Sequence, residues 1–216
     1  MKHLAVLFDL DGTLLDTLQD LADSVNKGLE YLSFPTHNIE AYKKLIGEGR
    51  ENLVFRALPE NNRDNETVHK LLERLNTEYA IHWADHTHPY PGIPELLDAL
   101  IAKNIKITVL SNKADDLTNM CVSKLLSPWH FTLVAGSRPG VPNKPDPAAS
   151  LQIAKQLDIS PSQFLYLGDS DIDMKTANAA GMYPVGALWG FRSKKELLTS
   201  GAKAVIKHPG ELLNYL

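Results

Sequence analysis

Short, fully apolar runs that alternate with helix-like segments constrain the fold of this chain more than any other feature. The first run, residues 4–8, is apolar at every position, which is typical of a strand buried on both faces of a parallel sheet. Strands alternating with helices predict right-handed βαβ units, and so an α/β fold with a doubly wound parallel sheet. Further apolar runs lie at 105–110, 131–135, 164–167 and 184–188, and helical patterns lie at 93–101, 148–157 and 171–180.

Residues 16–85 interrupt this alternation. They contain no convincing strand, but Leu18, Leu21 and Val25 begin an apolar stripe at helical spacing. We therefore predict two domains: an α/β core made of residues 1–15 and 86–216, and a helical domain, 16–85, inserted after the first strand. The Pro-rich stretch 88–92 is the expected return hinge, and a helix, a short strand near 204–206 and a last helix are expected after residue 193.

Composition excludes several classes of function. The 216 residues carry 22 Lys and Arg against 26 Asp and Glu, a formal net charge of −4, which argues against a broad basic surface for nucleic acid. No apolar run approaches the length of a membrane span, so we expect no membrane partner. Cys121 is the only cysteine, so no intrachain disulfide can form, and we expect a reducing, cytoplasmic location.

The first predicted strand ends in two acids, Asp9 and Asp11, followed by Gly12 and Thr13. In open α/β sheets, ligands bind beyond the carboxyl ends of the strands. Residues two apart in an extended chain point the same way, so Asp9 and Asp11 can face one pocket. Taken alone, the stretch fits an ordinary capped loop equally well.

Polar residues that could contribute to one site also lie in three further segments of the chain. Ser111, with a hydroxyl suited to a phosphate oxygen, follows the second run, and Lys144 lies in a Pro-rich loop. The fourth run is followed by Asp169, Asp171 and Asp173, three acids in five residues, which favours a hard cation such as Mg²⁺. Each feature also has an ordinary explanation: a helix N-cap, an exposed lysine, or an acidic helix start.

Together, and in this order, the four segments resemble the motifs of the haloacid dehalogenase superfamily. They read Asp9-x-Asp11-Gly12-Thr13, Ser111-Asn112, Lys144 and Gly168-Asp169-x-x-x-Asp173. Residues 13–17, 144–147 and 189–190 are most similar to the phosphoglycolate phosphatase-like branch. The resemblance implies a Rossmann-like core, and it identifies 16–85 as the α-helical cap domain that family members insert after the first motif.

The resemblance also implies catalytic roles. Asp9 is the expected nucleophile, forming an aspartyl-phosphate, and Asp11 is the expected general acid and then base. Mg²⁺ would be held by Asp9, by the main-chain carbonyl of Asp11 and by Asp169, while Asp173 would orient a ligand of the metal or Lys144. The residues expected to bind the phosphoryl group of the substrate are Thr13, Ser111, Asn112 and Lys144.

The implied activity is that of a magnesium-dependent phosphatase acting on a small phosphorylated metabolite. Dehalogenases and phosphonatases of the superfamily lack an acid at position 11, so Asp11 favours a phosphatase. The best single candidate for its substrate is 2-phosphoglycolate. Arg50 follows a Gly47-x-Gly49 turn that resembles a substrate-facing loop, and it could pair with a substrate carboxylate. A surface arginine after a connecting turn explains the same residues equally well.

Other functions remain open at this stage. A pyrophosphatase, a nucleotidase or a sugar phosphatase would use the same residues. A phosphosugar mutase would keep Asp9 and Asp11 but shield the aspartyl-phosphate from water, and a non-catalytic binding module would not require the paired acids. We expect a monomer or a homodimer.

Overall fold

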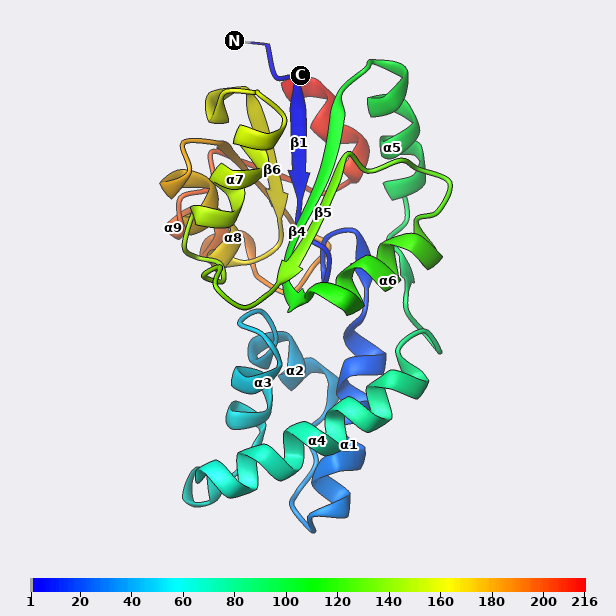
Figure 1. The fold of residues 1–216 in the computed structure, drawn as a ribbon, viewed down its shortest axis with the longest axis vertical. Coiled ribbons are helices and arrows are strands. Elements are labelled where there is room, and N and C mark those ends of the chain that lie inside the picture. The colour runs from blue at the N-terminus through cyan, green and yellow to red at the C-terminus, as the bar shows by residue number, and fades with distance from the viewer. Residues whose placement is uncertain (1) are drawn as a thin grey trace. The chain divides into compact units, whose positions relative to one another are not determined.

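A six-stranded, entirely parallel sheet forms the centre of the structure, a computed structural model that describes residues 2–216 (Figure 1). The strand order is β5-β4-β1-β6-β7-β8. The predicted α/β fold with a doubly wound parallel sheet is confirmed, and every apolar run named from the sequence contributes a strand. The strands are β1 (Ala5–Phe8), β4 (Lys106–Ala114), β5 (Leu133–Ser137), β6 (Phe164–Gly168), β7 (Tyr183–Ala187) and β8 (Ala204–Ile206).

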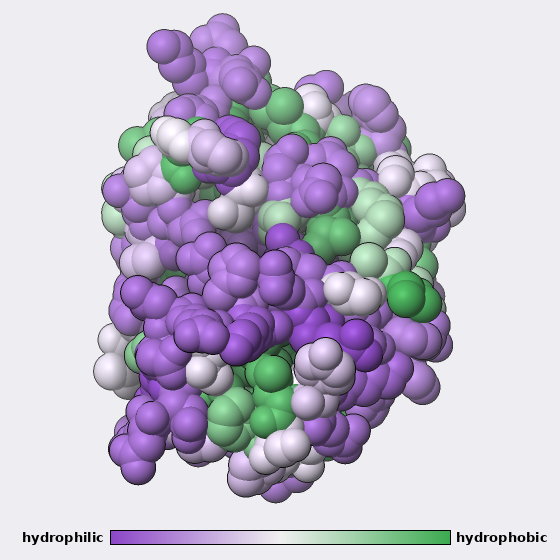
Figure 2. Space-filling model, turned by 60° about the horizontal axis from the view of Figure 1, so that its bottom comes forward, coloured by the Kyte–Doolittle hydropathy of each residue, from purple (hydrophilic) through white to green (hydrophobic). Residues whose placement is uncertain are grey.

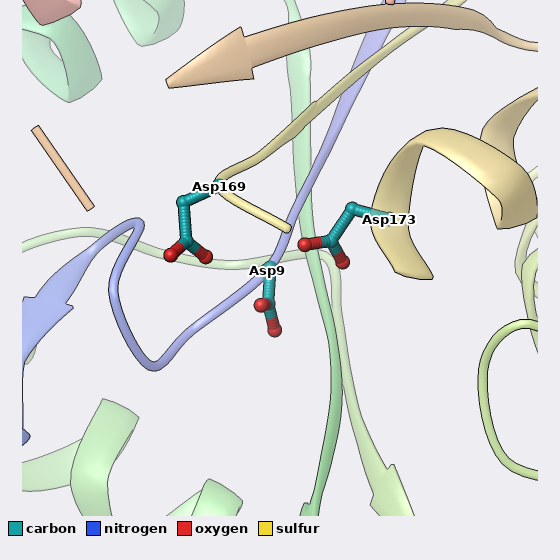
Figure 3. A group of neighbouring side chains, drawn as sticks. All are labelled: Asp9, Asp169 and Asp173. Carbon is teal, nitrogen blue, oxygen red and sulfur yellow. The ribbon is translucent and has the colours of Figure 1, made fainter. Parts of the chain in front are cut away.

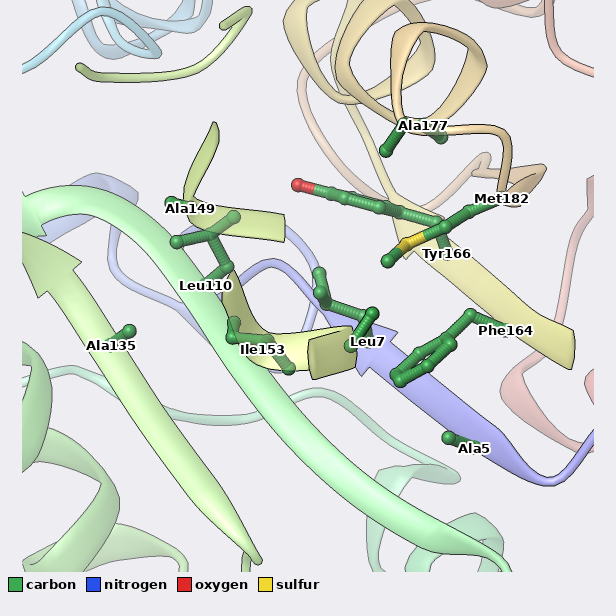
Figure 4. Packing of buried hydrophobic residues seen from close by; sticks show 12 residues of the cluster. Ala5, Leu7, Leu110, Ala135, Ala149, Ile153, Phe164, Tyr166, Ala177 and Met182 are labelled. Carbon is green, nitrogen blue, oxygen red and sulfur yellow. The ribbon is translucent and has the colours of Figure 1, made fainter. Parts of the chain in front are cut away.

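Both faces of the sheet are covered. Ala5 and Leu7 of β1 belong to a buried cluster with Ile153 of α7 (Ala148–Gln156) and Ala177 of α8 (Asp171–Ala179) (Figure 4). Side chains alternate along a strand, so Val6 and Phe8, also 0% exposed, point to the opposite face. Figure 1 shows α5 (Ile93–Ala102) and α6 (Asp115–Leu125) on the side of the sheet away from α7 and α8, which explains why β1 is apolar at every position.

The helices that flank the sheet include those predicted at 93–101, 148–157 and 171–180 and the helix expected after residue 193, and the structure adds α6 and η2. The expected last helix is present as a 3-10 helix, η3. Tight 3-10 turns are common in short terminal pieces, where few longer-range hydrogen bonds are possible. These helices are α5 (Ile93–Ala102), α6 (Asp115–Leu125), α7 (Ala148–Gln156), α8 (Asp171–Ala179), α9 (Lys194–Thr199), η2 (Pro161–Gln163) and η3 (Pro209–Tyr215).

The chain divides into two compact units. The first joins the stretch up to Leu15 to Pro89–Leu216, and the second is Asp16–His88. The sequence placed the return boundary between residues 85 and 86, slightly earlier.

Where the chain crosses between the units, β2 (Leu15–Asp16) and β3 (His88–Pro89) pair as a two-stranded sheet that the sequence did not predict, because two-residue strands are too short to show an alternating pattern.

The second unit is helical. Helix α1 packs against α4 closely enough that a Cβ on Gly28 would lie 2.7 Å from Cδ1 of Leu71. Asp20 on α1 is 2% exposed and accepts hydrogen bonds from the hydroxyl of Thr87 at 2.6 Å and from the main-chain N–H of His86 at 3.0 Å. The start of α1 is thereby tied to the returning chain. The helices are α1 (Leu18–Tyr31), α2 (Ile39–Leu45), α3 (Arg50–Ala57), η1 (Glu60–Asn62) and α4 (Asn65–His82).

The surface is mainly polar where Figure 2 shows it, with hydrophobic residues in a few small groups. Large exposed apolar side chains include Tyr31 and Phe55, which lie against the guanidinium groups of Arg74 and Arg63. Within residues 2–216, no helix combines the length and the apolar character that a membrane crossing requires.

Candidate active site

The carboxyl ends of three neighbouring strands bring the predicted site residues to one edge of the sheet. In the parallel register, Phe8 of β1 pairs with Val109 of β4 and with Leu167 of β6. The next residue, Asp9, donates its main-chain N–H to the carbonyl of Leu167 at 2.9 Å. The residues that follow β1, β4 and β6 therefore start from adjacent positions, as expected for ligand-binding residues of an open α/β sheet.

Three aspartates, Asp9, Asp169 and Asp173, lie close together (Figure 3), and with Lys144 they form a buried charged cluster. Carboxylate oxygens of Asp9, Asp169 and Asp173 lie within 4.8 Å of one another, and the three residues are 8%, 1% and 0% exposed. The Nζ of Lys144 lies 2.8 Å from Oδ1 of Asp9 and 2.7 Å from Oδ1 of Asp173. The ammonium group of Lys144 thus contacts two of the three carboxylates, and the guanidinium of Arg192 acts on Asp169. Three carboxylates against these two cations still leave an excess of buried negative charge, which is costly without a further cation.

The pKa values of the cluster report the same excess. Burial, followed by repulsion from Asp173, raises the pKa of Asp9 well above its ordinary value, and attraction to Lys144 offsets this only in part. Burial and Asp173 raise the pKa of Asp169 to about 7. Burial alone would lower the pKa of Lys144, but the nearby carboxylates of Asp173 and Asp9 raise it well above the usual range. Additional positive charge in this cluster would therefore stabilise the ionised carboxylates.

The donor set fits a hard cation such as Mg²⁺, which prefers oxygen ligands. Asp9 accepts from the Leu10 N–H and from Lys144 through Oδ1 alone, so its Oδ2 is available as a ligand or nucleophile. Both oxygens of Asp173 are already engaged, Oδ1 by Lys144 and Oδ2 by the N–H and hydroxyl of Ser170. Asp169 also accepts at both oxygens, from the hydroxyl of Thr13 at 3.2 Å and from the main-chain N–H of Phe191 at 2.7 Å, but both of these donors are neutral. Asp9, through its Oδ2, and Asp169 are thus the carboxylates best suited to hold the ion, because Asp173 is already neutralised by its ion pair with Lys144.

Two glycines allow the main chain to approach Asp169. A Cβ on Gly190 would lie 2.3 Å from the carbonyl oxygen of Gly12 and 2.5 Å from Oδ2 of Asp169. Gly12 has a φ of 83°, and a Cβ there would lie 2.5 Å from the same Oδ2. Because any side chain at either position would displace the Asp169 carboxylate, the two glycines keep this carboxylate in place.

Asn112 and Ser111 lie in the irregular last part of β4, which extends to Ala114 and thus beyond the predicted end at 110. Both amide atoms of Asn112 bond to the main chain of Lys144: Oδ1 accepts from its N–H at 2.9 Å, and Nδ2 donates to its carbonyl at 3.0 Å. Asn112, predicted to bind substrate, therefore holds the backbone of the catalytic-site lysine. Oγ of Ser111 accepts from the N–H of Lys113 at 3.1 Å, and its hydroxyl hydrogen can still be donated to an anion.

Lys113 is a site residue to which the sequence analysis gave no role. Its Nζ lies 3.0 Å from Oδ1 and 3.4 Å from Oδ2 of Asp11, and the two side chains are 4% and 15% exposed. Asp11 is thus paired with Lys113 and lies outside the carboxylate group of Asp9, Asp169 and Asp173. The available signal was its position two residues after Ser111, since such residues face the same side of extended chain.

Thr13 and Arg50 were also predicted to bind substrate. Thr13 is fully buried; its hydroxyl donates to Oδ1 of Asp169 at 3.2 Å, and its carbonyl accepts from the indole N–H of Trp189 at 3.0 Å. Arg50 belongs to the second unit, where it begins α3 and donates to the side-chain oxygen of Asn76. The turn before it requires glycine, since Gly47 and Gly49 have φ values of 132° and 87°.

Comparison with known proteins agrees with this arrangement. Residues 6–187 match the family model of haloacid dehalogenase-like hydrolases. The chain is 33% identical to a phosphoglycolate phosphatase of Chromobacterium violaceum, over 100% of this chain and 98% of that protein. It is 32% identical to a phosphoglycolate phosphatase of Aquifex aeolicus, over 86% of this chain and 85% of that protein.

Solved structures show the same likeness. A crystal structure from Lactobacillus delbrueckii subsp. bulgaricus, provisionally named a phosphoglycolate phosphatase, superposes with a TM-score of 0.94 at 30% identity, covering 100% of this chain and 98% of that one. The chain therefore belongs to the haloacid dehalogenase-like hydrolases. Within that family it lies in the phosphoglycolate phosphatase-like branch, and it is a phosphatase whose core has the Rossmann-like fold of the family.

Proposed function

We propose that this protein is a Mg²⁺-dependent phosphatase that hydrolyses a small phosphomonoester, with 2-phosphoglycolate as the best candidate, through an aspartyl-phosphate on Asp9. The observation that carries the proposal is the buried cluster in which Asp9 lies 2.8 Å from Lys144, beside Asp169 and Asp173. Its excess negative charge requires a cation, and its one ammonium group can contact a phosphoryl oxygen.

Asp9 would act as the nucleophile. Its Oδ1 is fixed by the Leu10 N–H and by Lys144, so Oδ2 is the oxygen that attacks phosphorus while the bond to the leaving alkoxide breaks. Asp11 would give a proton to that alkoxide and then remove one from the water that cleaves the aspartyl-phosphate. General acid–base help of this kind is typically worth about 10²–10⁴-fold in rate.

Mg²⁺ would be held by Asp9, Asp169 and the main-chain carbonyl of Asp11, and when bound it would neutralise charge on the phosphoryl group. Lys144 and the hydroxyl of Ser111 would hold the phosphoryl oxygens. The remaining predicted residues would act through these groups: Thr13 by its hydrogen bond to Asp169, Asn112 by its two bonds to the Lys144 main chain, and Asp173 by its ion pair with Lys144.

The choice of 2-phosphoglycolate is supported by the relatives from Chromobacterium violaceum and Aquifex aeolicus, both of which are named phosphoglycolate phosphatases. We assign the second unit, Asp16–His88, as the cap domain, with Arg50 as a ligand for the substrate carboxylate. The lone, buried Cys121 agrees with a reducing, cytoplasmic setting.

A phosphate-release assay tests the proposal. The substrates should include 2-phosphoglycolate, pyrophosphate, nucleoside monophosphates, sugar phosphates and a sugar bisphosphate, each with Mg²⁺ and with a chelator. We expect release that requires Mg²⁺, is fastest with 2-phosphoglycolate and is lost in Asp9→Asn but kept in Asp116→Asn, a control at an exposed acid of the same unit. Release that continues in Asp9→Asn would show that the mechanism is wrong, and isomerisation of the bisphosphate without release would indicate a mutase.

A further inference from the structure

A second buried lysine lies at this edge of the sheet, beside Asp11 and separate from the pairs that Lys144 makes. The Nζ of Lys113 is 3.0 Å from Oδ1 of Asp11, and the lysine side chain is only 4% exposed. An ammonium group removed from water to this extent is stabilised by the anions that surround it. Lys144 has two such carboxylates, Asp9 and Asp173, within 2.8 Å.

The main chain holds Lys113 firmly in this place. Its N–H donates to Oγ of Ser111 at 3.1 Å, and its carbonyl accepts from the hydroxyl of Thr118 at 3.1 Å. Close packing continues behind it, since a Cβ on Gly136 would lie 2.7 Å from the Lys113 carbonyl oxygen. The ammonium group therefore projects from a rigid base toward Asp11, whose side chain is the more exposed partner at 15%.

We infer that Lys113 is a specificity-determining residue, which binds a negative charge on the leaving group close to the ester oxygen. The inference rests on the proposed role of Asp11 as the acid that contacts the leaving oxygen. That contact is about 3 Å long, so Nζ of Lys113, a further 3.0 Å away, lies within about 6 Å of the ester oxygen. A carboxylate one carbon beyond the ester carbon falls within this range.

The substrate class that follows is narrow. A substrate carboxylate beside Lys113 would be attracted by this ammonium group, which also contacts Asp11. Short phosphorylated hydroxy acids place a charge at the required distance, whereas aryl phosphates and other esters with a neutral leaving group place none there. Lys113 would thus act from the sheet edge, independently of any contact that Arg50 makes with the substrate.

The experiment compares 2-phosphoglycolate with 2-phosphoglycolamide, a neutral analogue of nearly the same size, in the Mg²⁺-loaded full-length protein. In Lys113→Met, we expect kcat/KM for the acid to fall by about 10–100-fold, mainly through KM, because a hydrogen bond to a charged group is lost. The value for the amide should fall less, only by the part of the loss that follows when Asp11 loses its ion-pair partner, so the preference for the acid should drop about 10-fold. Lys106→Met, at the exposed start of the same strand, should leave both substrates unchanged.

Each other outcome has a definite meaning. An equal loss with both substrates would mean that Lys113 only holds Asp11 in place, and an unchanged preference for the acid would mean that another residue, such as Arg50, reads the charge; either result overturns the inference. The inference is also overturned if the wild-type enzyme has the same kcat/KM for the acid and for the amide. Lys113→Gln replaces Lys113→Met if circular dichroism shows the latter to be unfolded. Asp9→Asn is assayed in parallel. If that variant keeps its activity, the proposed mechanism is wrong, whatever the results for the Lys113 variants.

Discussion

The sheet edge of the first unit and the turn before α3 in the second unit hold their polar residues in contrasting ways. At the sheet edge, Asp9 and Lys144 are less than a tenth exposed, and each bonds to several groups of the protein. In the turn, Glu48 and Arg50 are partly exposed, and glycines at 47 and 49 determine the backbone path. The first arrangement fixes atoms for one kind of chemistry, whereas the second presents a side chain on a surface.

This contrast predicts which substitutions impair turnover of every substrate and which impair turnover of particular substrates. Buried charges are costly, so a cluster like that of Asp9, Asp169 and Asp173 is stable only with its partners in place, and most changes to it should impair turnover of every substrate. Arg50 is partly exposed and donates to the neutral side chain of Asn76, so its removal leaves no buried charge unpaired, and changes there should depend on which substrate is tested. The following predictions test this division, from the largest expected effect to the smallest.

Removal of the nucleophile should have the largest effect. Asp9→Asn keeps the size of the side chain but removes the attacking carboxylate, so kcat should fall by at least about 10⁴-fold with every substrate. Steady-state phosphate release measures this loss. A variant that lost activity with only one substrate would contradict the assignment of Asp9 to the chemistry common to all of them.

Lys144→Met should come next. It leaves Asp9 and Asp173 without their shared ammonium group, which we expect to lower kcat about 10²–10³-fold and to destabilise the metal-free protein by about 3–5 kcal/mol. Chemical denaturation with and without Mg²⁺ measures the second effect, and Mg²⁺ should restore more stability to the variant than it adds to the wild type. Lys155→Met, at an exposed lysine of α7, is the matched control. Equal stability of Lys144→Met and wild type without Mg²⁺ would contradict the charge argument.

Arg50→Ala should have a smaller, substrate-dependent effect. Loss of an arginine–carboxylate contact should reduce kcat/KM for 2-phosphoglycolate by about 10-fold and leave 2-phosphoglycolamide nearly unchanged. Arg74→Ala, at an arginine of α4 in the same unit, serves as the control. If turnover of 2-phosphoglycolate is unchanged in Arg50→Ala, the assignment of Arg50 to the substrate carboxylate is wrong.

Asp20→Asn should affect stability and not chemistry. Burial opposes ionisation of Asp20, but hydrogen bonds from Thr87 and His86 outweigh it and lower its pKa below the ordinary value of 3.8. The unfolded chain therefore binds more protons than the folded chain around this pH, so the stabilisation is full at neutral pH and is lost as the pH falls through the folded-state pKa.

Replacing one accepting oxygen by an amide group that faces donors should cost about 1–3 kcal/mol at pH 7. Denaturation at pH 7 and near pH 3 measures both values, and the difference between wild type and Asp20→Asn should shrink at the lower pH. A difference that stays constant over this range would show that the charge of Asp20 contributes nothing. Asp23→Asn, on the same helix, is the control.

The sequence was sufficient where one local pattern determines one structural outcome. Fully apolar runs predicted the buried strands, and the position of Asp9, Ser111 and Asp169 after such runs predicted their meeting at one edge, because parallel strands end on the same side. The family resemblance supplied the roles of these residues, which no spacing could provide.

The sequence was insufficient where a result depends on three-dimensional register. The pairing of Lys113 with Asp11 joins residues 102 positions apart, and the engagement of Asn112 with Lys144 joins residues 32 positions apart. The strands β2 and β3 have two residues each, too few to produce a periodic signal. In each case the deciding interaction lies between segments, where sequence patterns carry little information.

The two hydrogen bonds between Asn112 and the main chain of Lys144 have a consequence for variants of this site. Asn112 bonds to the N–H and the carbonyl of residue 144, groups that every non-proline residue possesses. A different side chain at position 144 would therefore keep both bonds while losing the ammonium group beside Asp9. A substitution at position 112 would do the reverse, because it removes this anchor but leaves the lysine side chain in the protein.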